Sequence, residues 1–155
     1  MTSWVVSDSG IMLSTYLPEK YSPQAVALLE EWTRQQTQIA APALIKYEFV
    51  SALRKSVARK VISADYAANS RDELLAHEIH LMLDDDLLRR AYELATQLNR
   101  PNAYDAQYLA VAERLNCEFW TADQRLFNAV NSHLAWVKWV GSFTPETGNP
   151  NYITP

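Results

Sequence analysis

Four acidic residues stand at positions whose neighbours are apolar. Asp8 follows the apolar run WVVS, and Asp123 comes shortly after the run CEFW. Asp105 shares a helical spacing with buried-type residues, and Glu48 lies four residues from Leu44 and from Ala52. Carboxylate oxygens are ligands that Mg²⁺ and Mn²⁺ prefer, and such ions favour phosphate substrates. The four acids are therefore candidates for a metal-dependent reaction on a phosphate.

Each acid, taken alone, also has a structural explanation. Asp8 and Asp123 can cap the helices that follow them, because aspartate accepts hydrogen bonds from the first backbone N–H groups of a helix. Asn102 and Asp105 have the spacing of a capping box, in which Asn102 is the N-cap. Glu48 can pair with Lys55 or be solvated. Only the joint placement of the four residues separates the two interpretations.

Short strands alternate with amphipathic helices along the chain. We expect strands at 4–7, 38–41, 78–82, 118–121 and 135–140. Between them we expect a brief helix before Pro18, a helix that Ser22 caps, a helix that Pro42 opens, and helices over 64–76, 84–99, 103–116 and 124–130. This alternation predicts an α/β fold with three layers, in which helices flank a short, mostly parallel central sheet. Residues 1–140 should form one domain, and 141–155 an irregular tail.

In such a sheet the four acids converge. Asp8 and Asp123 follow strands, Asp105 is in the first turn of a helix, and Glu48 is about two turns into another. These positions meet at the carboxyl edge of a parallel sheet, where ligands bind. Crowded carboxylates repel one another and raise their own pKa values, so a cation is needed to keep them ionised.

Composition restricts the class of protein further. The chain has 155 residues, a formal net charge of −4 and one cysteine, Cys117, so it fits one domain without a disulfide framework. No apolar run approaches a membrane span, and the start lacks a signal-peptide pattern. We expect a soluble, cytoplasmic protein. Acidity argues against general nucleic-acid binding, although four acids gathered in one pocket would leave the other charges balanced.

Four segments, VVSDSGIMLSTYLPE, PALIKYEFVSALRK, AYDAQYLAVAERL and FWTADQRL, carry a resemblance. In this order and at this spacing they resemble the PIN-domain family, particularly its VapC-type toxin ribonucleases, over residues 4–140. Ser7 and Asn102 depart from the commonest pattern, in which an apolar residue and a Ser or Thr stand there. The resemblance implies that Asp8, Glu48, Asp105 and Asp123 are catalytic and hold one or two Mg²⁺ or Mn²⁺ ions, with Ser9 and Thr121 as supporting hydroxyls.

The resemblance implies an endoribonuclease that leaves 5′-phosphate and 3′-hydroxyl ends, the toxin of a type II toxin–antitoxin pair. It further implies a small antitoxin as partner and a homodimer. Two alternatives remain open: a PIN nuclease of RNA maturation or decay without an antitoxin, and a non-catalytic PIN interaction module. A phosphoacceptor receiver or an aspartyl-phosphate phosphatase is not indicated, because VVSDSG lacks the paired acid that either requires.

Basic residues near the acids are candidates for binding the RNA backbone. They are Arg54, Lys55, Arg59, Lys60 and Arg125. Cations at a helix end are equally explained by the helix dipole. The run Asp84–Asp86 precedes an amphipathic helix and is interpreted as a cap with first-turn charges, outside the site. His77 and His80 should point to opposite faces of a strand, which does not favour a zinc site.

Overall fold

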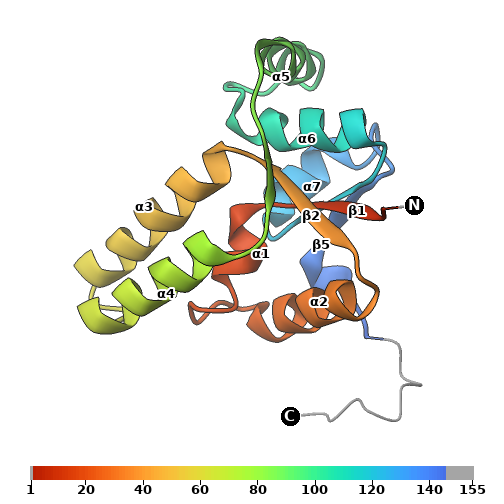
Figure 1. Ribbon diagram of the computed structural model, residues 1–155. Coiled ribbons are helices and arrows are strands. Elements are labelled where there is room, and N and C mark those ends of the chain that lie inside the picture. Colours follow the sequence, from red (N-terminus) through yellow and green to blue (C-terminus); the bar gives the residue numbers. More distant parts are fainter. Residues whose placement is uncertain (1, 146–155) are drawn as a thin grey trace.

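Five parallel strands form the centre of the protein. The computed structural model describes residues 2–145 (Figure 1). The sheet has the order β3-β2-β1-β4-β5, and each neighbouring pair is parallel. Its strands are β1 (Trp4–Ser7), β2 (Gln38–Pro42), β3 (His80–Met82), β4 (Glu118–Thr121) and β5 (Val137–Trp139). The expected α/β fold is confirmed, and the sheet is parallel at every described pairing.

Helices cover both faces of this sheet, as the period-2 pattern of the strands requires. Val6 and Ala40 point to one face, in a core that contains Phe49, Leu109 and Phe119. Val5 and Ile39 point to the other face, in a core with Leu28 and Trp32. The helices are α1 (Ser9–Leu13), α2 (Ser22–Arg34), α3 (Leu44–Ala58), α4 (Ala64–Ala76), α5 (Asp85–Gln97), α6 (Tyr104–Leu115) and α7 (Gln124–Val130).

The layers follow from these two cores. Helix α6 packs on β1, β2 and β4, and α5 packs on the outside of α6. Helix α2 contributes to the opposite core, and α3 and α4 lie together beside the sheet (Figure 1). Asn116 ends α6 in the left-handed region at φ 50°, which Asn tolerates, and Glu118 already begins β4. This short connection sets the first turn of α6 and the end of β4 on the same edge.

Several expected boundaries are wrong by one or two residues. Pro42 ends β2 instead of opening the next helix, so Glu48 is little more than one turn into α3. Tyr21, not Ser22, is the N-cap of α2. Asn102 does not cap α6: Ala103 is the N-cap position and makes no side-chain cap bond, while Asn102 Oδ1 accepts from Tyr104 N at 3.3 Å. The capping-box explanation of Asp105 is therefore wrong.

The described chain continues past the expected domain end at residue 140. A 3₁₀ helix, η1 (Val140–Ser142), buries Val140 beside α2, and the Phe143 ring lies edge-on to Trp120 at 5.8 Å. Residues 146–155, the rest of the expected tail, lie outside the described residues. Within 2–145 no helix is long and apolar enough to cross a membrane.

Candidate active site

Asp8 stands where the winding of the sheet reverses. The chain goes from β1 to β2 on one side and returns through β4 on the other, so β1 and β4 are neighbours and Ser7 pairs with Trp120. Ligands of open parallel sheets bind at the carboxyl ends of strands beside such a reversal. Asp8 begins there, directly after β1, and its Oδ1 accepts from Ile11 N at 2.9 Å as the N-cap of α1.

The other oxygen of Asp8 is held from β4. Asp8 Oδ2 accepts from the Thr121 hydroxyl at 2.5 Å and from Ala122 N at 3.0 Å. The buried Thr121 hydroxyl in turn accepts from Asp123 N at 2.9 Å, so one side chain ties the positions of both aspartates. Gly10 makes this approach possible, because a Cβ there would lie 3.1 Å from the Ala122 Cβ. The structure thus brings Asp8, Thr121 and Asp123 together.

Glu48 approaches Asp8 from α3. The buried Tyr108 hydroxyl of α6 donates a hydrogen bond to Glu48 Oε1, and the Ser9 hydroxyl is within hydrogen-bonding reach of both side chains. No ion pair among the described residues joins Glu48 to Lys55, so the alternative in which these two residues pair is wrong. The Tyr108 phenol and the Ser9 hydroxyl of α1 instead orient the Glu48 side chain toward the other acids.

Asp105 and Asp123 complete the row of acids. Asp105 lies in the first turn of α6 and its side chain is 45% exposed, with Arg100 Nη2 3.7 Å from Oδ2. Asp123 Oδ1 accepts from Arg125 N and Leu126 N, so Asp123 is the N-cap of α7. The capping interpretation therefore holds for Asp8 and Asp123 and fails for Asp105. Their caps leave both aspartates at the same edge as Glu48 and Asp105.

Electrostatic coupling runs along this row. Burial, and to a smaller extent the charge of Glu48, raises the pKa of Asp8 to about 6 against three hydrogen bonds that lower it. Burial and then the charge of Asp105 raise the pKa of Glu48. Burial and then the charge of Asp123 raise the pKa of Asp105, which Arg100 opposes. Along the row, Glu48 thus disfavours the ionisation of Asp8, Asp105 that of Glu48, and Asp123 that of Asp105, which a bound cation would reverse.

The donor set suits magnesium better than an ion that needs a protein cage. Within residues 2–145 no three Asp, Glu, His or Cys side chains are gathered closely enough to enclose an ion. Magnesium keeps several of its waters and binds through one or two carboxylates together with substrate phosphates. The Asp105 side chain is 45% exposed and has Arg100 3.7 Å from one of its oxygens, whereas three hydrogen bonds occupy most of the lone pairs of Asp8.

The five basic residues predicted from the sequence are separated by the structure. Lys55 and Arg59 line a cavity of about 620 Å³ that reaches Gly10 and Ala122 beside Asp8. Arg54 and Lys60 are exposed and do not contribute to its lining. Arg125 is exposed at the start of α7, two residues after Asp123, which caps that helix. The spacing of these residues along the sequence did not show which of them would line the cavity.

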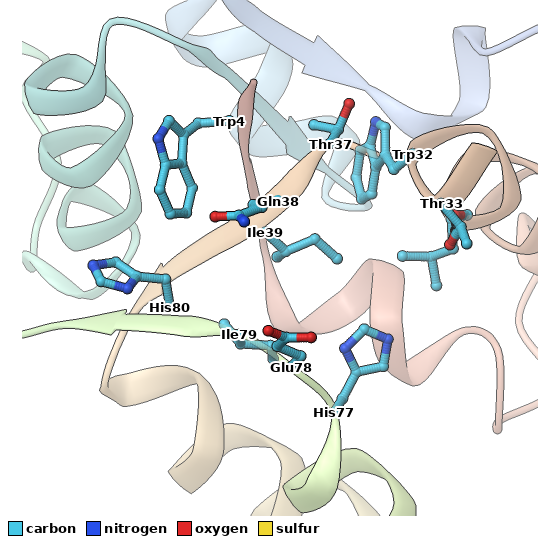
Figure 2. A pocket seen from close by; sticks show the side chains of 11 residues that line it. Trp4, Trp32, Thr33, Thr37, Gln38, Ile39, His77, Glu78, Ile79 and His80 are labelled. Carbon is cyan, nitrogen blue, oxygen red and sulfur yellow. Dashed lines mark hydrogen bonds between the residues drawn. The ribbon is translucent and has the colours of Figure 1, made fainter. Parts of the chain in front are cut away.

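Two other polar groups lie away from the acids. Asp84 caps α5 through Leu87 N, and Asp85 and Asp86 stand in the first turn, as the sequence predicted. A second cavity of about 420 Å³ lies at the opposite edge of the sheet, among Trp4, His77, Glu78 and His80 (Figure 2). The His80 ring packs at 5.2 Å from the Trp4 ring, and Figure 2 shows the His77 side chain turned to the other side.

Sequence reasoning missed Tyr108 and Arg100 at this site. Tyr108 was interpreted as a core residue, although it stands three residues after Asp105, the spacing that places two side chains on one helix face. Arg100 precedes Pro101 in a loop, where nothing in the local pattern predicts its direction. Thr121, which the family resemblance implied as a supporting hydroxyl, does lie beside Asp8, at the end of β4.

Two named relatives match most of this chain in sequence. The chain is 29% identical to Ribonuclease VapC3 of Pyrobaculum aerophilum over 126 residues, which cover 79% of this chain and 91% of the relative. It is 28% identical to Ribonuclease VapC9 of Mycobacterium tuberculosis over 122 residues, 79% of this chain and 87% of the relative.

Solved structures share the fold at lower identity. A Pyrobaculum aerophilum protein aligns with a TM-score of 0.64 at 20% identity, over 91% of this chain and 93% of that one. A chain of a toxin-antitoxin complex from Klebsiella pneumoniae aligns with a TM-score of 0.60 at 18% identity, over 91% and 97%. The family model described as the PIN domain matches residues 5–132, which include all four acids. The resemblance seen in the sequence is confirmed: the chain belongs to the PIN domain family.

Proposed function

We propose that this protein is a divalent-metal-dependent endoribonuclease and the toxin of a type II toxin–antitoxin pair. The observation that carries the proposal is the coupled row Asp8, Glu48, Asp105 and Asp123 at the carboxyl edge of the sheet. Acids that raise one another's pKa values cost free energy, so a purely structural site would pair them with cations. The relatives named ribonucleases support RNA as the substrate.

The residues of the row take different parts in this reaction. When bound, Mg²⁺ or Mn²⁺ supplies a Lewis acid for the phosphate and an acidified water as nucleophile. Asp105 offers its free oxygens to that ion, and Asp8, fixed by Thr121 and Ala122, offers its remaining lone pair. Glu48 accepts from Tyr108 and has a second oxygen that orients the attacking water. Asp123 adds negative charge from the cap of α7.

The decisive experiment is cleavage of a panel of structured RNAs in Mg²⁺, Mn²⁺ or EDTA. Asp105→Asn is the cleanest variant, because Asp8 and Asp123 also cap helices and their replacement changes the fold locally. Exchange of a supporting residue in a metal site costs 10–100-fold, so loss of a ligand should cost more than about 100-fold. Retained cleavage by a folded Asp105→Asn protein, or cleavage in EDTA, would overturn the metal assignment.

The toxin part of the proposal has its own test. Expression of the wild-type chain alone should stop growth and degrade cellular RNA, while Asp105→Asn, produced to the same level, should do neither. Co-expression of a small partner encoded beside the gene should restore growth. The complex from Klebsiella pneumoniae, which its title describes as toxin-antitoxin, supports a partner of this kind. Normal growth with active, folded protein would leave a nuclease that has no toxin role.

The homodimer that the sequence led us to expect belongs to the same proposal. The purified protein should sediment at twice its chain mass of 17.7 kDa.

A further inference from the structure

A cleft beside the acids has no part in the reaction described above. Its volume is about 620 Å³, and it lies between the second half of α3 and the connection from α1 to α2. Gly10 and Ala122 line its inner end, and these are the residues that close around Asp8. The cleft therefore begins beside Asp8 and leads from it toward the end of α3.

Helix α3 places acid and cations on one side. Glu48, Ala52, Lys55 and Arg59 follow one another at spacings of four, three and four residues, which align on one helix face. At 1.5 Å per residue, Lys55 and Arg59 lie roughly 10 and 16 Å beyond Glu48 along the axis. Arg59 is the C-cap residue of α3, Arg54 falls on another face, and Lys60 lies beyond the cap with φ 60°.

The charge of the cleft is uncompensated. Lys20 lines it from the opposite wall, with its ammonium 5.2 Å from the centre of the Tyr21 ring. Within residues 2–145 no ion pair involves Lys20, Lys55 or Arg59, and Glu19 is the one acid among the lining residues. Lys55 and Arg59 are exposed to solvent and free to meet an anion.

We propose that an RNA strand cut at the acids continues through this cleft, where Lys20, Lys55 and Arg59 bind its backbone phosphates. This inference rests on the proposed function and adds the direction of the substrate and its phosphate contacts. Continuity with the acids favours a nucleic acid, because one polyanion then presents a phosphate to the row and further phosphates to the cations. A dinucleotide has one phosphodiester and should not use the cleft.

The test compares two double variants that remove the same charge. Lys55→Gln/Arg59→Gln removes two cleft cations, and Arg54→Gln/Lys60→Gln removes two neighbouring cations outside it. Binding of a labelled 12-nucleotide RNA is measured in EDTA over a salt series. Cleavage of the same RNA and of a dinucleotide is then measured in Mg²⁺. Thermal unfolding confirms that all proteins are folded, which the exposure of the four side chains favours.

The cleft variant should bind the 12-nucleotide RNA at least tenfold more weakly, with a salt slope reduced by about 1.4, or 0.7 for each lost phosphate contact on a single strand. Its KM for that RNA should rise while dinucleotide cleavage stays unchanged. The matched variant should retain most of the affinity. Equal losses of RNA affinity in both variants, or no RNA binding by the wild type, would overturn the proposed role of the cleft. Cleft-dependent binding without any cleavage would instead refute the nuclease and leave the cleft standing.

Discussion

The two ends of helix α6 differ in how their charged side chains are paired. At its C-terminal end, Glu113 receives two hydrogen bonds from Arg90 of α5, at 2.6 and 2.8 Å, and Arg114 contacts Asp84 at 2.5 Å. At its N-terminal end, Asp105 faces other carboxylates and has one cation, Arg100, at 3.7 Å. The same helix thus joins a neutralised interface to a site of accumulated negative charge.

This difference separates charges that stabilise the fold from charges kept for a ligand. Pairing lowers the pKa of Glu113 and of Asp84, so folding favours their ionised forms. Burial and the neighbouring acids raise the pKa values of Asp105 and Glu48, so folding disfavours the ionised forms of these two residues. A bound cation would stabilise the second arrangement. Four substitutions, in three experiments, test the comparison.

The largest effect is expected for Tyr108→Phe, which changes the site end of α6 and leaves the paired end intact. The phenol holds Glu48, and loss of such a supporting hydrogen bond costs about 10–100-fold in activity or metal affinity. A Mg²⁺ titration of RNA cleavage should therefore require more metal for half-maximal rate, at nearly unchanged Tm. An unchanged titration curve would make Tyr108 a core residue only.

A smaller effect, of opposite sign at the two ends, is expected from a matched pair of Glu→Gln exchanges. Glu48→Gln removes a destabilising charge and keeps an acceptor for Tyr108, so Tm of the metal-free protein should rise by a few degrees. Glu113→Gln breaks a partly exposed ion pair worth about 0.2–1 kcal/mol, so Tm should fall by about 1–3 °C. Scanning calorimetry in EDTA at pH 7 measures both. Shifts of the same sign would remove the distinction between the two ends.

The smallest effect is a pH dependence at the paired end. Arg114 and the Leu87 N–H hold the pKa of Asp84 at about 2, below its value in the unfolded chain. The pairing of Asp84 with Arg114 should therefore stabilise the protein above about pH 4, and this stabilisation should be lost as the pH falls toward 2. Asp84→Asn keeps the cap of α5, since Asn is a good N-cap. Urea unfolding should show a less stable variant at pH 6 and no difference near pH 2.

The sequence predicted the parallel sheet, both capping aspartates and the edge on which the acids meet, because each depends on local pattern and strand direction. It did not predict that Asp105 lacks a capping role, since Asn102 turns to Tyr104 instead. It grouped Arg54 with Lys55, although one residue along a helix turns a side chain through about 100°. Lys20 was not noticed, because it reaches the cleft through a long-range packing of the α1–α2 connection.

The hydrogen bond from Thr121 to Asp8 also determines when, during synthesis of the chain, the site can form. These two residues are 113 positions apart, and β4 pairs directly with β1 at the centre of the sheet. A growing chain that has not yet released β4 from the ribosome contains Asp8, Glu48 and Asp105 without the hydroxyl and the amide that fix the first of them. Under the proposed function, the nascent protein stays inert toward the messenger and ribosomal RNA that surround it until nearly its whole domain has emerged.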